Sequence, residues 1–442
     1  MAFSSEHLAQ HLDLPNAPQR IWVAYSGGVD SHCLLHALAA LSPRHPALDL
    51  NAVHVHHGLS LNADAWAAHC RAVCAQLQIP IQLIHVDAKP ANGQSPEAAA
   101  REARYAALRR IVQPGDWLLT AHHQDDQAET LLLQLLRGSG VKGLAGMPAR
   151  SAFAQGLLLR PLLDFSRAEL EDYARAQGLR WVEDESNLFR GYDRNFLRHE
   201  LVPLLRERWP AAQALFARTA RHCAEAAELL DELARLDLQA ILAEDSQTIH
   251  IPALLALSES RQRNALRGWI TAAGFRLPET AQLEQIQRNV LHAAWDATPC
   301  VRCGAAEVRR YRDGLYLMKA LAPHDPAQRI AWDMTQPLAL PQLDVGLVAK
   351  ADVGKGLAQA RLTGAHITVR FRQGGEHCRP VGRAHHHDLK KLFQEAGVPP
   401  WRRDRIPLIF VDDRLAQVVG HWVDEAFAAK PGEPSIDIVS EG

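Results

Sequence analysis

Two consecutive glycines lie between serines near the start of the chain, in the segment Ser26-Gly27-Gly28-Val29-Asp30-Ser31. Paired glycines allow a sharp turn that exposes backbone N–H groups, and a helix that begins there directs its positive end at a bound anion. The lysine of a Walker loop is absent, so the turn is not built to grip a γ-phosphate as that loop does. We expect a cradle for pyrophosphate. The alternative is a glycine turn that merely joins a strand to a helix.

A second polar segment runs from Thr120 to Thr130. Within it, Asp126 and Glu129 are three positions apart, which places both carboxylates on one face of a helix. Two carboxylates beside a phosphate pocket repel ATP unless a cation lies between them, and either Mg²⁺ or the ammonium group of a substrate would serve. In the alternative interpretation, Asp125 and Asp126 only complement the positive start of a helix and Glu129 is solvated.

The elements that must position these segments alternate along the chain between residues 21 and 160. After a first strand, we expect strands over Leu50–His56, Ile81–Val86 and Trp117–Ala121, with helices near 63–77, 96–111 and 125–136. This alternation predicts an α/β fold with a doubly wound parallel sheet, in which ligands gather at the carboxyl ends of the strands. The segments that contain Ser26, His56 and His122 each follow a strand, so we expect them to converge on one crevice.

We expect a catalytic domain over residues 1–210, a mainly helical middle domain over 211–322, a linker over 323–358 and a small α+β domain over 359–442. The linker is inferred from prolines at positions 323, 326, 337 and 341. A hairpin is expected over Glu307–Lys319 in the middle domain. In the last domain, a helix is expected over Asp388–Ala396, with strands over Ile367–Arg372, Leu408–Val411 and Gln417–Val423.

The composition favours a multidomain cytoplasmic protein. Hydrophobic residues make up 47% of the 442 positions, yet no run of about 18 apolar residues occurs, and the seven cysteines are scattered. We therefore expect reduced thiols and no membrane partner. A net charge of −2 conceals a basic region between Arg361 and Arg405, with ten Lys/Arg against four Asp/Glu, which suits a polyanionic partner.

Further motifs accompany the glycine turn in a fixed order. They are His54-Val55-His56-His57-Gly58-Leu59, the glycine-rich basic stretch Leu136–Met147, Asp184-Glu185-Ser186-Asn187 and Tyr192-Asp193-Arg194-Asn195. With these motifs the chain resembles the tRNA(Ile)-lysidine synthetase family of PP-loop ATP pyrophosphatases. The resemblance implies ATP-dependent ligation of lysine to C2 of the wobble cytidine in an isoleucine tRNA with a CAU anticodon. An adenylated cytidine is the intermediate, pyrophosphate and AMP are released, and the product lysidine switches codon reading from AUG to AUA.

The resemblance also implies roles for particular residues. The phosphates of ATP would be held by His56 and the turn residues Ser26, Gly27, Gly28, Val29, Asp30 and Ser31, and Asp30 would also place Mg²⁺. Asp126 and Glu129 match the carboxylates that recognise lysine. The lysine amine must lose a proton before it attacks, and His123 is the candidate acceptor. Arg104 is expected to contact a phosphate or the transition state, although a solvated helix position would also explain it.

Binding of tRNA is expected from residues in two regions. Arg194, Asn195 and Arg198 would contact the tRNA backbone or shape the cytidine pocket, unless they form only an exposed helix start. In the last domain, basic side chains interleave with Phe371 and Trp401, as suits RNA; they are Arg370, Arg372, Arg379, Arg383, Lys390, Lys391, Arg402 and Arg403. By resemblance this domain engages the acceptor stem; the alternative is that its basic residues form only a solvated helix face.

The expected partners are thus this tRNA and L-lysine, and the sequence allows a homodimer.

Two rival functions share the glycine turn. A PP-loop tRNA thiolase would need catalytic cysteines near the nucleotide, and Cys33 lies just inside a helix on an apolar face. A non-catalytic RNA-binding protein would keep an inactive nucleotide loop, and the presence of Asp30, Asp126 and Glu129 argues against such decay. Lysidine formation is therefore the favoured interpretation.

Overall fold

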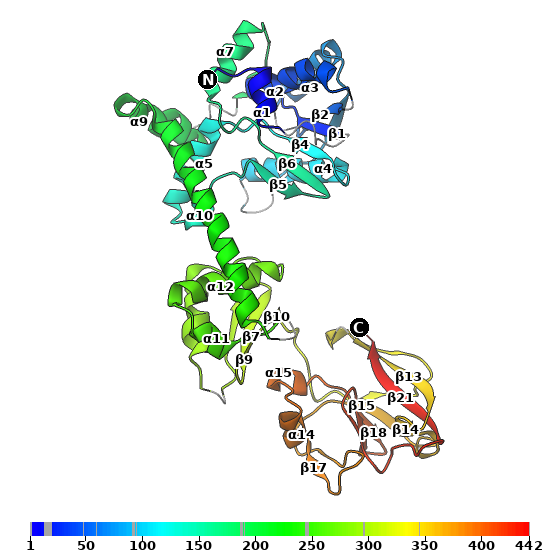
Figure 1. The fold of residues 1–442 in the computed structure, drawn as a ribbon. Coiled ribbons are helices and arrows are strands. Elements are labelled where there is room, and N and C mark those ends of the chain that lie inside the picture. Colours follow the sequence, from blue (N-terminus) through cyan, green and yellow to red (C-terminus); the bar gives the residue numbers. More distant parts are fainter. Residues whose placement is uncertain are drawn as a thin grey trace. The chain divides into compact units, whose positions relative to one another are not determined.

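The computed structural model describes residues 2–12, 20–46, 48–58, 60–90, 93, 95–185, 189, 191–243, 247–294, 297–343 and 345–441. The chain divides into two compact units, Met1–Leu230 and Asp231–Gly442, here named unit 1 and unit 2 (Figure 1). The boundary falls within the helix α10, Ala212–Ile241. Among the described residues, no helix is both long and apolar enough to cross a membrane.

Unit 1 is built on a six-stranded sheet in the order β3-β2-β1-β4-β6-β5. Its strands are β1 Arg20–Ala24, β2 Asp49–His56, β3 Ile81–His85, β4 Trp117–Leu119, β5 Arg150–Phe153 and β6 Gly156–Leu159. The first five in this order pair in parallel, and β5 adds an antiparallel edge. Alternate residues of β1 enter different cores, because Ile21 and Val23 pack in one cluster and Trp22 in another. Both faces are therefore buried, which confirms the doubly wound α/β fold.

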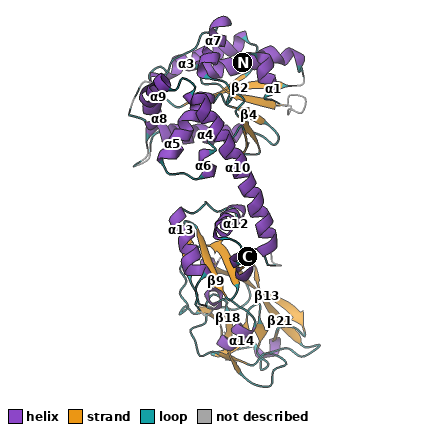
Figure 2. Cartoon of the chain, turned by 60° about the vertical axis from the view of Figure 1, so that its left-hand side comes forward, coloured by secondary structure: helices purple, strands orange, loops and turns teal. Residues whose placement is uncertain are grey.

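Helices flank this sheet (Figure 2). Their bounds are α1 Ser5–Gln10, α2 Val29–Leu41, α3 Ala63–Gln76, α4 Pro96–Ile111, α5 Gln124–Leu136, α6 Val141–Leu144 and α7 Arg167–Ala176. The chain then continues through α8 Asp193–Phe196, the π-helix η4 Leu197–Leu201 and α9 Val202–Arg208. The expected strands and helices of this unit are all found, with ends that agree to within two residues.

The first part of unit 2 combines helices with a four-stranded sheet in the order β7-β10-β9-β8. The strands are β7 Ile249–His250, β8 Cys300–Cys303, β9 Ala306–Tyr311 and β10 Gly314–Lys319, and the helices are α11 Ile251–Leu255, α12 Glu259–Ala272, α13 Thr280–Gln285 and the π-helix η5 Ile286–Leu291. The hairpin expected over Glu307–Lys319 is confirmed by the antiparallel pairing of β9 and β10.

The linker expected over 323–358 is wrong, because much of that stretch forms strands of the last domain. They are β11 Ile330–Ala331, β12 Leu338–Leu340, β13 Val345–Val353 and β14 Leu357–Ala358. β13 pairs antiparallel with β21, Pro434–Glu441, along its whole length, and β11 pairs with β15, Ile367–Arg370. The prolines lie before and between these strands, where a missing N–H group breaks no ladder.

The remaining elements of the last domain are β16 His377–Cys378, β17 His387–Asp388, α14 Leu389–Glu395, α15 Pro400–Arg403, β18 Leu408–Val411, β19 Arg414–Val418 and β20 Trp422–Val423. The single strand expected over Gln417–Val423 is two strands, because the chain turns at Gly420, where φ is +73°. The α+β character expected for this domain is otherwise present.

Candidate active site

The glycine turn joins β1 to α2. Gly27 has φ +90°, in the left-handed region that favours glycine, and Gly28 is the residue that caps α2. The two serines stabilise the turn, because the Ser26 N–H donates to Ser31 Oγ (3.2 Å) and Ser31 Oγ donates to the Gly28 carbonyl (3.0 Å). The Val182 N–H donates to the Gly27 carbonyl (3.0 Å). The turn is therefore held in one shape from both sides.

A cavity of about 670 Å³ opens beside this turn. It is lined by Ser26, His56 and His122, one from each of the three segments that were expected to converge. Arg104 also lines it and lies 3.3 Å from His57, between Nη2 and Nε2. Burial lowers the pKa of the His122 imidazole to about 3, so this ring is neutral at physiological pH. The cavity is therefore a polar crevice at the carboxyl ends of parallel strands.

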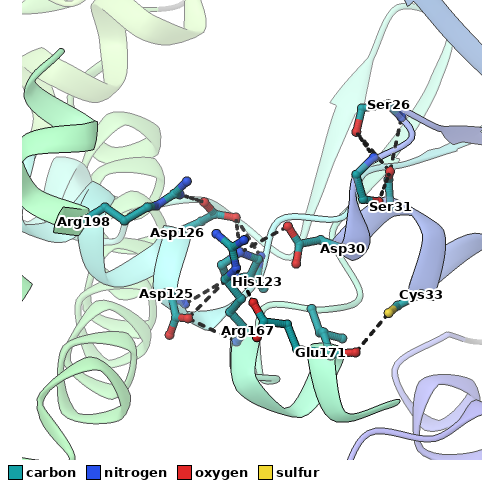
Figure 3. A network of polar contacts seen from close by, with 12 residues as sticks. Ser26, Asp30, Ser31, Cys33, His123, Asp125, Asp126, Arg167, Glu171 and Arg198 are labelled. Carbon is teal, nitrogen blue, oxygen red and sulfur yellow. Dashed lines mark hydrogen bonds and ion pairs between the residues drawn. The ribbon is translucent and has the colours of Figure 1, made fainter. Parts of the chain in front are cut away.

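His123 is buried at the start of α5 and organises the carboxylates around it (Figure 3). Its Nδ1 accepts the Asp125 N–H (3.2 Å), so the ring proton lies on Nε2, which faces Asp126 Oδ2 at 3.4 Å and Asp30 Oδ2 at 3.7 Å. The His123 N–H donates to Asp126 Oδ2 (3.1 Å). Both ring nitrogens are thus engaged, and neither offers a free lone pair to a substrate amine. In this geometry His123 orients the surrounding carboxylates, and its role as proton acceptor stays a prediction.

Asp126 and Glu129 lie on one face of α5, as expected, but both are already paired with arginines. Arg198 donates from Nε to Glu129 Oε1 (2.6 Å) and from Nη2 to Asp126 Oδ1 (3.0 Å). Arg194 donates from Nε to Glu129 Oε2 (2.8 Å). Burial opposes the charge on Asp126, yet His123, Arg194 and Arg198 together hold its pKa below the ordinary value. The two arginines expected to reach tRNA therefore neutralise the carboxylates expected to bind lysine.

Asn195, the third of the residues expected to meet tRNA here, is buried and donates from Nδ2 to the Phe189 carbonyl (2.9 Å). This bond joins α8 to Phe189. Leu59, Ser186 and Asn187 of the quoted motifs lie outside the described residues.

Asp30 has the properties of a ligand for Mg²⁺. Its Oδ1 is buried and has no hydrogen-bond partner among the described residues. Burial raises the pKa of this carboxyl group, against the opposing charges of His123 and Arg167. In the described part of the chain, no group of three or more His, Cys, Asp or Glu residues is arranged to hold a metal. Because Mg²⁺ usually takes one or two carboxylates and completes its shell with phosphate and water oxygens, Asp30 fits such an ion.

Sequence analysis did not identify Arg167, Trp181 or His199, which also line the cavity. Ser166 caps the start of α7 and Gly178 follows its end, and both are signals that a sequence can show. No local pattern, however, indicates that the first residue of α7 reaches the glycine turn, because that placement depends on contacts distant in sequence.

The basic residues expected to bind RNA in the last domain differ in their surroundings. Lys390, Lys391 and Arg402 are exposed. Four arginines form ion pairs within the domain: Arg370 with Asp413, Arg372 with Asp404 (3.1 Å), Arg379 with Glu425 (3.1 Å) and Arg383 with Glu395 (2.9 Å). Arg403 is buried and donates from Nε to the Val398 carbonyl (2.8 Å), a contact within the domain.

Family models match three parts of the chain. A PP-loop domain matches residues 3–205, a TilS substrate binding domain matches 250–316, and a TilS substrate C-terminal domain matches 367–439. These matches confirm the expected PP-loop fold and the resemblance drawn from the motifs.

Relatives match the chain over nearly its whole length. The chain is 48% identical over 432 residues to a tRNA(Ile)-lysidine synthase from Coxiella burnetii, covering 98% of this chain and 95% of that relative. It is 44% identical to one from Methylococcus capsulatus, with 94% of each covered, and 43% identical to one from Alkalilimnicola ehrlichii, with 97% of this chain and 96% of the relative covered. At this identity and coverage, together with the cavity and the glycine turn, the chain belongs to the tRNA(Ile)-lysidine synthase family.

Proposed function

We propose that this protein adenylates the wobble cytidine of an isoleucine tRNA with a CAU anticodon and then joins lysine to it. In the first step, the cytidine O2 forms a bond to the α-phosphorus of ATP, and pyrophosphate leaves. In the second step, the ε-amine of lysine attacks C2, and AMP leaves with the electron pair of the broken C–O bond. The observation that carries the proposal is the single cavity lined by Ser26, Asp30, His56 and Asp126. Because the reaction acts on tRNA, we assign it to the cytoplasm.

The glycine turn is suited to hold the leaving pyrophosphate. The N–H groups of Gly27, Gly28 and Val29 lie in the turn or at the start of α2, where the helix dipole favours negative charge. The Ser26 hydroxyl, 3.1 Å from Ser31 Oγ, adds a donor. Asp30 would hold Mg²⁺, which neutralises charge on the phosphates when it is bound. The role of the protein is then to orient the triphosphate and to keep its bridging oxygen in line with the attacking base.

The lysine site requires an exchange of partners. Asp126 and Glu129 carry two negative charges, and Arg194 and Arg198 already balance them. A lysine amine entering as a cation would add a positive charge to a neutral cluster, which is unfavourable away from water. Lysine must therefore replace at least one guanidinium contact on these carboxylates. Because Arg194 and Arg198 belong to α8 and η4, binding of lysine is expected to shift those segments.

The chain offers exposed positive charge for the polyanionic partner in Lys390, Lys391 and Arg402. Of the other arginines expected to bind RNA in this domain, four are balanced by carboxylates and Arg403 is buried, so these three side chains are the best candidates for phosphate contacts.

The test uses the full chain with ATP, Mg²⁺ and a transcript of the isoleucine tRNA, with and without lysine. We expect pyrophosphate without lysine, then AMP and a lysidine-sized mass at the wobble nucleoside when lysine is added. Formation of ADP, or incorporation of labelled sulfur without lysine uptake, would contradict the proposal.

A variant separates the two steps. Asp126→Asn removes a charge from the lysine cluster, so we expect it to slow lysidine formation by about 10-fold or more while pyrophosphate release falls much less. Asp172→Asn, an exposed change outside the cavity, is the control and should match the parent. Equal loss of both steps in Asp126→Asn would contradict the assignment of this residue to lysine.

A further inference from the structure

The helices α2 and α7 lie side by side and run in the same direction. Cys33 Sγ donates to the Leu170 carbonyl (3.2 Å), and one turn further on, His36 Nδ1 lies 2.8 Å from Tyr173 Oη. Each step advances by three residues in both helices, so the two helices are parallel and in register. One step back along this register, Asp30 of α2 is level with Arg167 of α7. The amino ends of the two helices therefore meet at the glycine turn.

Arg167 lines the same cavity as Ser26, Gly28 and Asp30. Its charge acts on Asp30, where it opposes the effect of burial on the pKa of that carboxyl group. Figure 3 shows Arg167 gathered with Asp30, His123 and Asp125 around one point. The first residue of α7 thus places a positive charge at the start of the phosphate turn.

The Arg167 residue is fixed at two points. Its N–H donates to Asp125 Oδ2 (3.1 Å), and its Nε donates to Glu171 Oε1 (3.0 Å). Neither terminal nitrogen has a hydrogen-bond partner among the described residues. The N–H groups of Ser166 and Glu169, in contrast, are satisfied by the capping box of α7. The guanidinium group, and not the helix end itself, is therefore what this helix offers to an anion.

The other arginines of the cavity have partners of their own, and Arg101 lies over the Tyr105 ring, 5.0 Å from its centroid. Arg198 is paired with Glu129 and Asp126, and Arg104 contacts His57. The glycine turn itself contains no lysine or arginine. A pyrophosphate group carries several negative charges, and the turn supplies only neutral N–H and O–H donors. A positive side chain facing the turn would therefore supply what the turn lacks.

We propose that Arg167 binds the β- and γ-phosphates of ATP and stays on the pyrophosphate when it leaves. This inference rests on the proposed function for its place in the reaction. As the cytidine O2 bonds to the α-phosphorus, the bond from that phosphorus to the bridging oxygen breaks, and its electron pair stays on pyrophosphate. The two terminal nitrogens of Arg167 donate to that pyrophosphate and balance its growing charge.

The test measures ligand binding to the full chain by calorimetry with Mg²⁺ and without tRNA. The probes are α,β-methylene-ATP, pyrophosphate and AMP. For Arg167→Ala we expect affinity for the first two probes to fall by roughly 10- to 100-fold, as for loss of a charge-assisted hydrogen bond. Affinity for AMP should be unchanged, because AMP lacks the phosphates that Arg167 contacts. Arg167→Lys, which keeps a point charge, should give an intermediate loss.

Arg175→Ala is a matched control on the same helix. Arg175 donates to the other oxygen of Glu171 (3.0 Å), so this variant also removes a bridge to Glu171, but Arg175 does not line the cavity. We expect it to bind all three probes like the parent. The inference is overturned if Arg167→Ala binds α,β-methylene-ATP and pyrophosphate as the parent does. It is also overturned if its affinity for AMP falls by the same factor, or if Arg175→Ala loses as much affinity for the two phosphate probes. Because no tRNA is present, failure of lysidine formation in the parent would be a separate result.

Discussion

Asp30 carries its charge where the surroundings disfavour it. One carboxylate oxygen is buried without a described partner, and burial raises the pKa despite His123 and Arg167 nearby. A group that needs a cation for full stabilisation destabilises the protein when the cation is absent. The residue best placed to organise Mg²⁺ is therefore also one that weakens the ligand-free fold.

The change Asp30→Asn should stabilise unit 1 at pH 7 in the presence of a chelator, because it removes this unfavourable charge. At about pH 2.5 the carboxyl group is protonated in both folded and unfolded chains, so the variant and the parent should differ little. As pH rises, the unfolded chain loses the proton first, so the free energy of unfolding of the parent falls relative to that of the variant. This fall ends once pH has passed the raised pKa of the folded state. Urea midpoints followed by hydrogen exchange of β1 and α2 measure this difference. A variant less stable than the parent at pH 7 would contradict the argument.

At this scale, residue types and local spacing could be read from the sequence, but partners could not. The spacing of Asp126 and Glu129 correctly placed them on one helical face. Their pairing with Arg194 and Arg198 joins positions 65 or more residues apart, and no local pattern encodes such a contact. His123 shows the same limit in part, because its Nδ1 accepts the N–H of nearby Asp125, whereas its Nε2 also faces Asp30, which is distant in sequence.

At the scale of elements, the glycine turn depends on one backbone conformation. Gly27 has φ +90°, and a Cβ there would lie 2.9 Å from Val182 Cγ2 and 3.1 Å from Cys70 Sγ. Gly58 also has a positive φ, +63°, but a Cβ there would meet nothing within 4 Å. A side chain at Gly58 would therefore meet backbone strain alone, whereas a side chain at Gly27 would meet both strain and steric crowding.

Gly27→Ala should therefore lower the stability of unit 1 more than Gly58→Ala does. For Gly58→Ala we expect only the strain of a left-handed residue, about 1 kcal/mol. For Gly27→Ala we expect strain and displacement of the Val182 side chain, with a loss of roughly 2–3 kcal/mol from unit 1 and weaker binding of α,β-methylene-ATP. Hydrogen exchange of α2 and calorimetry measure the two effects. Equal losses in both variants would show that crowding at Val182 and Cys70 has no importance.

Elements with strong periodicity and clear limits were predicted well, and those whose stability comes from pairing were not. The expected helix over 96–111 has the bounds of α4, because Ser95 caps it and proline occupies its first position. The stretch 323–358 was misread as a linker because its prolines dominate the local pattern, whereas β13 is stabilised by β21, which lies at the other end of the domain. The parallel packing of α7 on α2 was likewise invisible, since it is a tertiary register.

At the scale of the whole molecule, arginine serves two opposite purposes. The terminal nitrogens of Arg167 have no hydrogen-bond partner among the described residues, whereas most described arginines of unit 2 pair with carboxylates or donate to backbone carbonyls. A basic composition therefore overstates the charge available to RNA. The contrast is sharpest between neighbours, because Arg402 is exposed and Arg403 is 7% exposed.

This contrast predicts different consequences for two adjacent substitutions. Arg403 donates to the Val398 carbonyl (2.8 Å) and to Tyr311 Oη (3.2 Å), so Arg403→Ala should leave a buried carbonyl unpaired and destabilise unit 2 by about 2 kcal/mol. Hydrogen exchange of β9 and α15 in the full chain measures that loss. Arg402→Ala should change stability by less than about 0.5 kcal/mol. It should instead weaken tRNA binding and reduce the slope of log affinity against log salt by about 1, as expected for one lost phosphate contact. If Arg403→Ala lowered the salt slope without faster exchange, or Arg402→Ala accelerated exchange without changing tRNA binding, the two assignments would have to be reversed.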